Sequence, residues 1–137
     1  MTGLVRLLPA LVALSSVAGC NFANRRWLDN PGRNETVRVE SGQRLYLDLE
    51  ENVTAGYRWE ARCDDADVSV TVEHVAARPA DGRVGAPGRA RVEIRVHRGY
   101  DGPSAVRFRY RRPWEPAAAK EFTVCLYRRT GDCAFWE

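Results

Sequence analysis

Seven short segments, in which apolar and polar residues alternate, constrain the fold of this chain more than any other feature. A period of two places the apolar side chains on one face of a β-strand and the polar side chains on the other. In Arg91–Val96 every second residue is a valine or an isoleucine, so this segment predicts a strand with one buried face. We expect strands over Thr36–Glu40, Arg44–Leu49, Tyr57–Ala61, Val68–Val75, Arg91–Val96, Val106–Arg111 and Glu121–Tyr127.

Turn residues separate these segments. Clusters such as Ser41-Gly42, Asp81-Gly82 and Asp101-Gly102-Pro103 are typical of the connections between strands. About seven short strands, each with one apolar face, in roughly 100 residues are the pattern of an immunoglobulin-like sandwich. The cysteine pair that flanks a strand tryptophan in antibody domains is absent, although Trp59 is well placed for the core. The sequence therefore predicts an all-β fold, an immunoglobulin-like β-sandwich of about seven strands, over residues 36–137.

The charge of the chain argues against a nucleic-acid partner. The net charge is only +3, and arginines alternate with acids along the strands, as in Arg91-Val92-Glu93, which is typical of a solvated sheet face. With 45% hydrophobic and 28% charged residues, the composition is ordinary for a soluble globular protein. The 137 residues fit one domain, and we expect a monomer.

Residues 1–19 have the pattern of an export signal. Arg6 precedes the apolar run Leu7–Leu14, and small residues lead to Val17-Ala18-Gly19-Cys20. The run is too short to cross the hydrocarbon core of a bilayer, about 30 Å thick, as an ordinary helix. Small residues before a cysteine resemble the lipobox of bacterial lipoproteins, whose signal peptide is removed and whose cysteine is acylated. The alternatives are a plain secretory signal, with Cys20 an ordinary cysteine, and a short membrane-embedded helix.

An acylated Cys20 would make residues 20–35 a lipid anchor and a tether, because Asn, Arg, Pro and Gly are frequent there. Several fatty chains hold a protein stably on a membrane, at about 0.8 kcal/mol for each buried methylene. The expected location is then the bacterial cell envelope. Asn21 stands where some lipoproteins retained in the inner membrane carry an aspartate, which favours the outer membrane in a Gram-negative organism.

Three cysteines follow Cys20, namely Cys63, Cys125 and Cys133. Export to an oxidising compartment permits one disulfide among the three, and the sequence leaves the pairing open. Cys133 is the favoured partner for one of the other two. The histidines, His74 and His97, lack metal-ligand spacing to any cysteine, so we expect no zinc site.

The residues for catalysis are scarce. A nucleophile and a base are available only as Cys63 or Cys125 with His74 or His97, and a cysteine between apolar neighbours is far more often inert than ionised. The glycines of residues 82–88 lack the lysine-serine or lysine-threonine ending and the following helix of a phosphate-binding loop. We therefore expect no enzyme and no cofactor.

Three connections between the predicted strands carry unusual residues. Loop 1 (residues 52–57) reads Asn52-Val53-Thr54-Ala55-Gly56-Tyr57, and loop 2 (residues 82–89) contains Gly85-Ala86-Pro87-Gly88. Loop 3 (residues 111–116) contains Arg112-Pro113-Trp114-Glu115, which places a large aromatic side chain in a turn, where burial is hardest. Such loops indicate a binding edge.

In this order the three loops resemble those of the chagasin family of cysteine-protease inhibitors, over roughly residues 35–127. The first loop of that family reads asparagine-proline-threonine-threonine-glycine followed by tyrosine or phenylalanine. Asn52, Thr54, Gly56 and Tyr57 agree with this pattern, whereas the residues at positions 53 and 55, a valine and an alanine, depart from it.

The other two loops extend the resemblance. Gly85, Pro87 and Gly88 match the frequent glycine-x-proline-glycine ending of the second loop, a motif that is weak alone. Arg112-Pro113-Trp114-Glu115, which leads into the last strand, resembles the most characteristic stretch of the family.

The resemblance implies a small immunoglobulin-like sandwich whose three loops gather at one end and dock on a papain-like cysteine protease. Loop 1 would enter the catalytic cleft, with Thr54 near the catalytic cysteine, and loops 2 and 3 would clamp the protease on either side. Inhibition would be reversible and competitive. The alternative is an immunoglobulin-like envelope lipoprotein that binds another partner in adhesion or assembly. The expected protease-binding residues are Asn52, Val53, Thr54, Ala55, Gly56, Tyr57, Gly85, Ala86, Pro87, Gly88, Arg112, Pro113 and Trp114.

Overall fold

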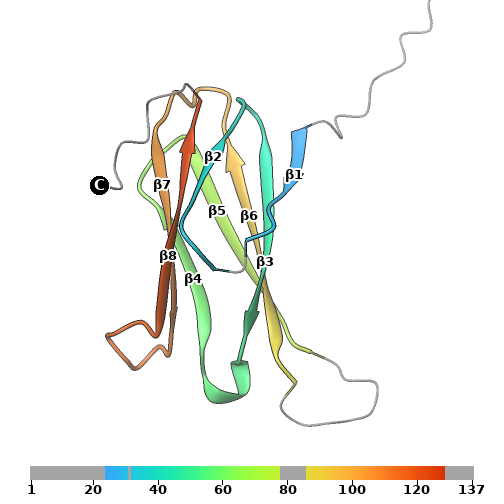
Figure 1. Cartoon of the computed structure of the whole chain (residues 1–137), viewed down its shortest axis with the longest axis vertical. Helices are drawn as coiled ribbons and strands as arrows, with labels where there is room; N and C mark the ends of the chain where they lie inside the picture. Colours follow the sequence, from blue (N-terminus) through green and yellow to red (C-terminus); the bar gives the residue numbers. More distant parts are fainter. Residues whose placement is uncertain (1–23, 31, 78–85, 129–137) are drawn as a thin grey trace, which may run out of the picture.

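The alternating segments form strands that pack as two sheets face to face (Figure 1). The computed structural model describes residues 24–30, 32–77 and 86–128. In this part of the chain the first sheet has the strand order β1-β3-β6-β5 and the second has the order β2-β8-β7-β4. The strands are β1 (Arg25–Trp27), β2 (Glu35–Arg38), β3 (Arg44–Glu51), β4 (Arg58–Cys63), β5 (Val68–Val75), β6 (Gly88–Val96), β7 (Ser104–Arg111) and β8 (Lys120–Tyr127). The predicted all-β sandwich is confirmed.

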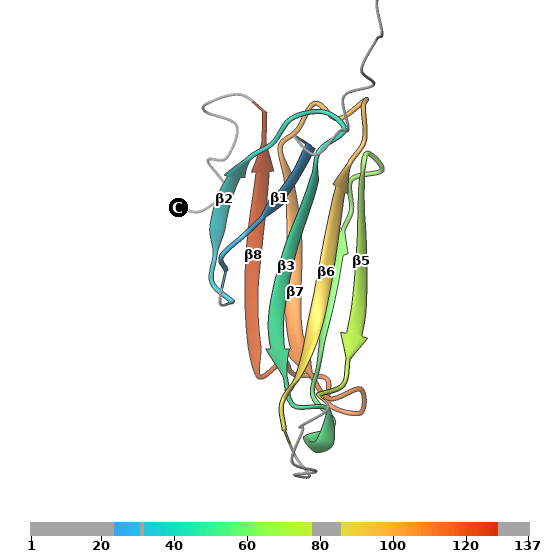
Figure 2. The ribbon, with the colours of Figure 1, turned by 90° about the vertical axis from the view of Figure 1, so that its right-hand side faces the viewer.

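The pairing of the strands is antiparallel except at the N-terminal end of the chain. The register places Leu45 opposite Ile94 in the first sheet and Phe108 opposite Phe122 in the second. β1 pairs in parallel with β3, and β2 pairs in parallel with β8, so the chain crosses from the first sheet to the second between these two strands. Figure 2 shows β1 beside β3 and β2 beside β8.

The fold reaches further toward the N-terminus than the sequence analysis predicts. Residues 20–35 were expected to be an anchor and a tether, but β1 pairs Arg25 with Arg44. Leu28 and Asn30 are buried. The Asn30 side chain accepts the backbone N–H groups of Gly32 and Arg33 and donates to Glu35 Oε2, so this polar side chain is satisfied although buried. Three strand residues are too few for a period-two pattern to be recognised.

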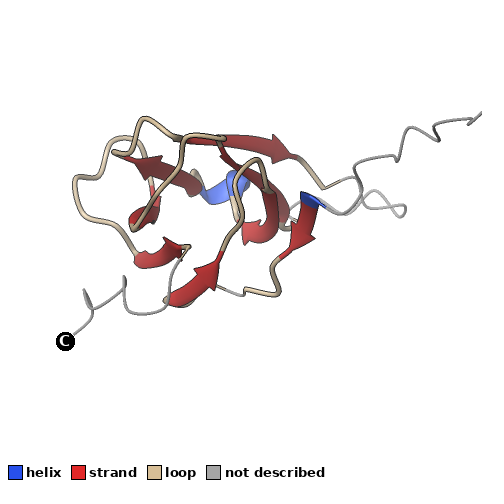
Figure 3. Cartoon of the chain, turned by 90° about the horizontal axis from the view of Figure 1, so that it is seen from above, coloured by secondary structure: helices blue, strands red, loops and turns tan. Residues whose placement is uncertain are grey.

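The core lies between the sheets and consists of the inward residues of the alternating segments. Leu45, Leu47 and Leu49 from β3 face Val106 and Phe108 from β7, and all five are buried. Figure 3, which looks along the long axis, shows that strands and loops make up nearly all of the described chain. No helix in the described ranges is long and apolar enough to cross a membrane.

The structure assigns a state to two of the cysteines. Cys125 is disulfide-bonded, whereas Cys63 is a free thiol. Burial raises the pKa of the Cys63 thiol, which disfavours the thiolate that a nucleophile needs. Cys20 and Cys133 lie outside the described residues.

Candidate functional site

Three connections meet at one end of the sandwich, which we call the loop end. Loop 1 joins β3 to β4, and loop 3 joins β7 to β8 (Figure 1). The register pairs Glu51, the last residue of β3, with Gly88, the first residue of β6, so loop 2 leads into the same end. Arg58 pairs with Arg111, which brings the end of loop 1 next to the start of loop 3.

Loop 1 is a closed turn. Val53–Ala55 form a 3-10 helix, and the Asn52 side chain caps it by accepting the N–H of Ala55 at 3.1 Å. Gly56 ends the turn with φ at 83°, a left-handed conformation that favours glycine, and its N–H donates to the Val53 carbonyl at 2.9 Å. The Asn52 side chain therefore fixes the turn that follows it.

Loop 3 lies against loop 1 through Arg112. Its Nε donates to the Ala55 carbonyl at 2.9 Å, and its Nη1 donates to Glu115 Oε1 at 3.0 Å. The guanidinium carbon lies 4.4 Å from the centre of the Tyr57 ring, a cation–π distance. Two of these contacts, to Ala55 and Tyr57, reach loop 1, and the contact to Glu115 fixes the guanidinium within loop 3.

Trp114 lies over Gly56 and remains open to solvent. A Cβ built on Gly56 would come within 2.5 Å of Cη2 of the indole, so only glycine fits beneath the ring. The residue is nevertheless 69% exposed. An exposed indole held by a glycine below it and an arginine beside it presents its outer face without needing to be ordered on binding.

Loop 2 is described only in its last part. Gly85 lies outside the described residues, Ala86 is half-buried and Pro87 is exposed. Gly88 is buried, and a Cβ there would come within 2.9 Å of the Val75 carbonyl and 3.4 Å of Val53 Cγ2. Loop 2 therefore approaches loop 1 at a position where glycine allows close contact.

A column of aromatic rings supports the loop end from below. Tyr57 stacks on Tyr110 with the ring centres 5.1 Å apart, and Tyr110 lies 4.9 Å from Trp59. Trp59 in turn contacts Phe122 edge-on at 5.3 Å. The Tyr110 hydroxyl accepts the backbone N–H of Asn52 at 2.8 Å. The loops therefore rest on packed rings that continue into the core.

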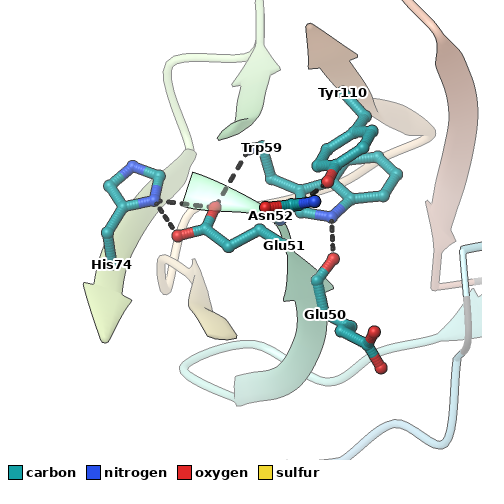
Figure 4. A network of polar contacts seen from close by, with 6 residues as sticks. All are labelled: Glu50, Glu51, Asn52, Trp59, His74 and Tyr110. Carbon is teal, nitrogen blue, oxygen red and sulfur yellow. Dashed lines mark hydrogen bonds and ion pairs between the residues drawn. The ribbon is translucent and has the colours of Figure 1, made fainter. Parts of the chain in front are cut away.

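A buried polar network lies directly beneath loop 1 (Figure 4). Glu51 is 1% exposed, and both of its carboxylate oxygens contact His74 Nδ1, at 2.9 and 3.0 Å. The backbone N–H of Trp59 donates to Glu51 Oε2 at 3.3 Å, and the Trp59 indole N–H donates to the Glu50 carbonyl at 2.9 Å. This network holds the last residues of β3 against β4 and β5.

The sequence analysis did not identify Glu51 as a site residue and considered His74 only as a possible catalytic base. The alternation of inward and outward residues was the pattern that could have identified both residues as inward-facing. Glu51 continues the inward series Leu45, Leu47 and Leu49, and His74 continues the inward series that starts at Val68. Both residues therefore face inward, but β3 and β5 lie on either side of β6, so the alternation alone does not show that they meet.

The described residues show no arrangement for metal binding or nucleophilic catalysis. In the described ranges no three His, Cys, Asp or Glu side chains lie close enough to hold a metal ion. Cys63 pairs with Val106 at the other end of β4, away from the loop end, and His97 contacts the Ser69 hydroxyl. What the loop end offers is a firm convex edge with an exposed indole.

Comparison with known proteins agrees with this geometry. The family model described as the chagasin family peptidase inhibitor I42 matches residues 38–126. Amoebiasin-1 of Entamoeba histolytica is 32% identical over 91 residues, which cover 66% of this chain and 86% of the relative.

Solved structures share the fold. The cysteine protease inhibitor EhICP2 from Entamoeba histolytica superposes with a TM-score of 0.62 at 18% identity, over 77% of this chain and 97% of that one. The solution structure of Amebosin gives 0.62 at 29% identity, over 77% and 98%. PbICP-C in complex with falcipain-2 gives 0.55 at 21% identity, over 77% and 99%.

Proposed function

The chain belongs to the chagasin family of peptidase inhibitors and is an inhibitor of cysteine proteases, and we propose that it inhibits them by docking loops 1, 2 and 3 into and around the active-site cleft. Inhibition is reversible and competitive, and the target is a papain-like cysteine protease. The observation that carries this proposal is the contact between loops 1 and 3, in which Arg112 donates to the Ala55 carbonyl and Trp114 covers Gly56.

Loop 1 is the part that enters the cleft. Thr54 is exposed at the tip of the 3-10 turn, where its hydroxyl can form hydrogen bonds with a protease. The turn is closed by hydrogen bonds on both sides, so it does not present an extended peptide bond to the catalytic nucleophile. A loop already held in its bound shape loses little conformational entropy on docking.

Loops 2 and 3 flank loop 1 and widen the contact. Tryptophan and arginine are the residue types that dominate binding hot spots, and Trp114 and Arg112 lie side by side on loop 3. On loop 2, Ala86 is half-buried and Pro87 is exposed. The solved complex of PbICP-C with falcipain-2 supports a protease as the partner of this fold.

The two departures from the usual first loop are compatible with this role. Val53 Cγ2 lies 3.4 Å from the place that a Cβ on Gly88 would take, and the Ala55 carbonyl accepts a hydrogen bond from Arg112. The comparisons do not favour the alternative of a lipoprotein that acts in adhesion or assembly.

The experiment that tests this function is a titration of the fragment of residues 21–137 against papain and a cathepsin L-like enzyme. Hydrolysis of a fluorogenic peptide is followed at several substrate concentrations. We expect nanomolar inhibition that substrate relieves. A folded fragment that leaves both enzymes fully active at micromolar concentration would overturn the proposal.

We also propose that the protein is exported and anchored as a monomer to the bacterial cell envelope through an acylated Cys20. The support is the sequence alone, an apolar run followed by small residues and a cysteine. Mass spectrometry of the protein from membranes tests this directly. The expected N-terminal residue is Cys20 with fatty acyl groups, which a Cys20→Ala variant would lack; an unmodified cysteine, or an uncut signal, would contradict the proposal.

A further inference from the structure

The Glu51 carboxylate is buried with few partners. Its side chain has no exposed surface, whereas the side chain of His74 is 30% exposed. The described contacts of the carboxylate are the His74 imidazole and one backbone N–H, that of Trp59 (Figure 4). A buried carboxylate without a countercharge is costly, so the charge of this imidazole decides how well Glu51 is accommodated.

In the described ranges no second cation is in contact with the Glu51 carboxylate, although Arg89 and Lys120 line the same cavity. On β6 the residues that face the core here are Gly88 and Ala90, and on β4 it is Trp59. Glu73 and Arg91 are paired across β5 and β6 on the outer face of the same sheet. Arg89 is likewise exposed, opposite Val75. Within the described ranges, the His74 imidazole is therefore the group in contact with Glu51 that can carry a positive charge.

The position of the pair links two of the loops. Glu51 directly precedes loop 1, and His74 is the residue before the end of β5, opposite Ala90. The same network reaches β4 through Trp59, two residues after the end of loop 1. A change in the Glu51 to His74 contact therefore acts on both ends of loop 1 and on the strand that carries Gly88.

We propose that Glu51 and His74 are a pH-dependent positioning pair for the inhibitory loops, which holds loop 1 and the Gly88 end of loop 2 in their binding arrangement when the imidazole is protonated. This inference rests on the proposed function of the loop end. When the imidazole loses its proton, the buried carboxylate loses its countercharge and the base of loop 1 loosens. Histidine is the side chain whose charge changes most readily near neutral pH, so inhibition should weaken as the pH rises and this imidazole loses its proton.

A first measurement follows the loops without a protease. Backbone amide NMR shifts of the purified protein are recorded from about pH 5 to 8 for the wild type, His74→Gln and His97→Gln. The chain has two histidines, so His97→Gln leaves His74 as its only imidazole. We expect the amides of residues 52–57 and of Gly88 to shift together with the His74 ring in the wild type and in His97→Gln, and not in His74→Gln.

Loop amides that stay fixed in the wild type, or that still shift in His74→Gln, would overturn the proposal. Glu51→Gln is a second variant that keeps the shape of the side chain and removes the buried charge. Its loop amides should also be insensitive to pH, and a wild-type titration curve in this variant would count against the pair. This variant keeps the test decisive if His74→Gln does not fold.

A second measurement compares inhibition constants against one papain-like protease at pH 5 and pH 8, as the ratio of variant to wild type. The ratio cancels the pH dependence of the protease itself. For His74→Gln we expect inhibition about tenfold weaker at the lower pH and nearly equal at the higher, since one charged contact is worth about that factor. For His97→Gln the ratio should stay near one.

The same His74→Gln ratio at both pH values would show a merely structural role and would overturn the proposal. Failure of the proposed function looks different, because the wild type would then not inhibit at either pH. In that case the NMR titration still decides whether Glu51 and His74 control the loops.

Discussion

Trp114 covers Gly56 so closely that a Cβ built on the glycine would lie 2.5 Å from Cη2 of the indole. The two residues come from different loops and different strand pairs, and their contact makes loops 1 and 3 one surface. Gly56 and Trp114 can be substituted one at a time, so each side of this contact can be tested separately.

Gly56→Ala should displace the indole. Gly56 has φ at 83°, so alanine is strained there, and its methyl group would also collide with the ring. We expect a loss of about 1–2 kcal/mol in the free energy of unfolding, measured with urea, and weaker inhibition. Gly42→Ala is the matched control, because φ is 79° and nothing lies within 4 Å. It should lose similar stability and keep full inhibition; equal inhibition by both variants would contradict the role of the contact.

Trp114→Ala should weaken protease binding by about 2 kcal/mol or more, as the truncation of an aromatic hot spot does. The free energy of unfolding should change by less than about 0.5 kcal/mol, because the side chain is mostly exposed. Trp27, which is 58% exposed on β1, gives the control variant Trp27→Ala. Inhibition constants decide between the two, and an equal loss in both would argue against a hot spot on loop 3.

Arg112→Lys should weaken inhibition although the charge is kept. A lysine ammonium cannot bind the Ala55 carbonyl and Glu115 together and stack on Tyr57, so loop 1 loses its connection to loop 3. We expect faster dissociation of the complex, by about tenfold, in surface plasmon resonance. Arg44→Lys, whose arginine is paired with Glu93 at the opposite end of β3 from loop 1, should dissociate at the wild-type rate. Unchanged dissociation in Arg112→Lys would show that the loops are joined by other contacts.

Acid should remove the contribution of Glu60 to stability. The hydrogen bond from Arg111, together with its charge, holds the pKa of the Glu60 carboxyl below its ordinary value of 4.5. A carboxyl whose pKa is lower in the folded state stabilises the fold at a pH above its unfolded pKa. This stabilisation is lost as the pH falls through the folded pKa. The effect is small and screened by salt, because the pair reaches solvent. Urea unfolding of wild type and Glu60→Gln should differ at pH 7 and converge toward pH 3; a constant difference would contradict the ionic origin.

Cys63 should react slowly with iodoacetamide near neutral pH. Burial raises its pKa, so little thiolate is present in the folded protein. Mass spectrometry should show slow labelling of this residue under native conditions and rapid labelling in urea. Rapid native labelling would mean that the edge of β4 opens readily.

The alternation of residues predicted the strands well because burial of one sheet face is a local property of the sequence. β3, β5, β6, β7 and β8 lie within a few residues of their predicted ranges. Prediction failed where the pattern was short, as for Arg25–Trp27, whose pairing depends on the edge of β3 rather than on its own three residues. The strand predicted over Arg44–Leu49 ended two residues too early, because Glu51 is a charged residue at an inward position.

The loops were recognised from their residue types, but their contacts were not predictable. Arg112 binds the carbonyl of Ala55, which is 57 residues away in the sequence. Period-two patterns and turn chemistry say nothing about which loop touches which, because that depends on the twist and register of both sheets. The proline at position 113 and the glycine at position 56 indicated turns, and only the fold places the indole of Trp114 over Gly56.

Because β1 pairs in parallel with β3, β1 begins at the end of the sandwich that is opposite to the loop end. The chain enters the sandwich beside Arg44, where β3 begins, and the eight residues of β3 then lead to loop 1. At about 3.3 Å per residue, this strand is about 26 Å long. The start of β1 is therefore separated from loop 1 by the full height of the sandwich, so an enzyme that docks on the loop end would not collide with the point where the chain enters the fold.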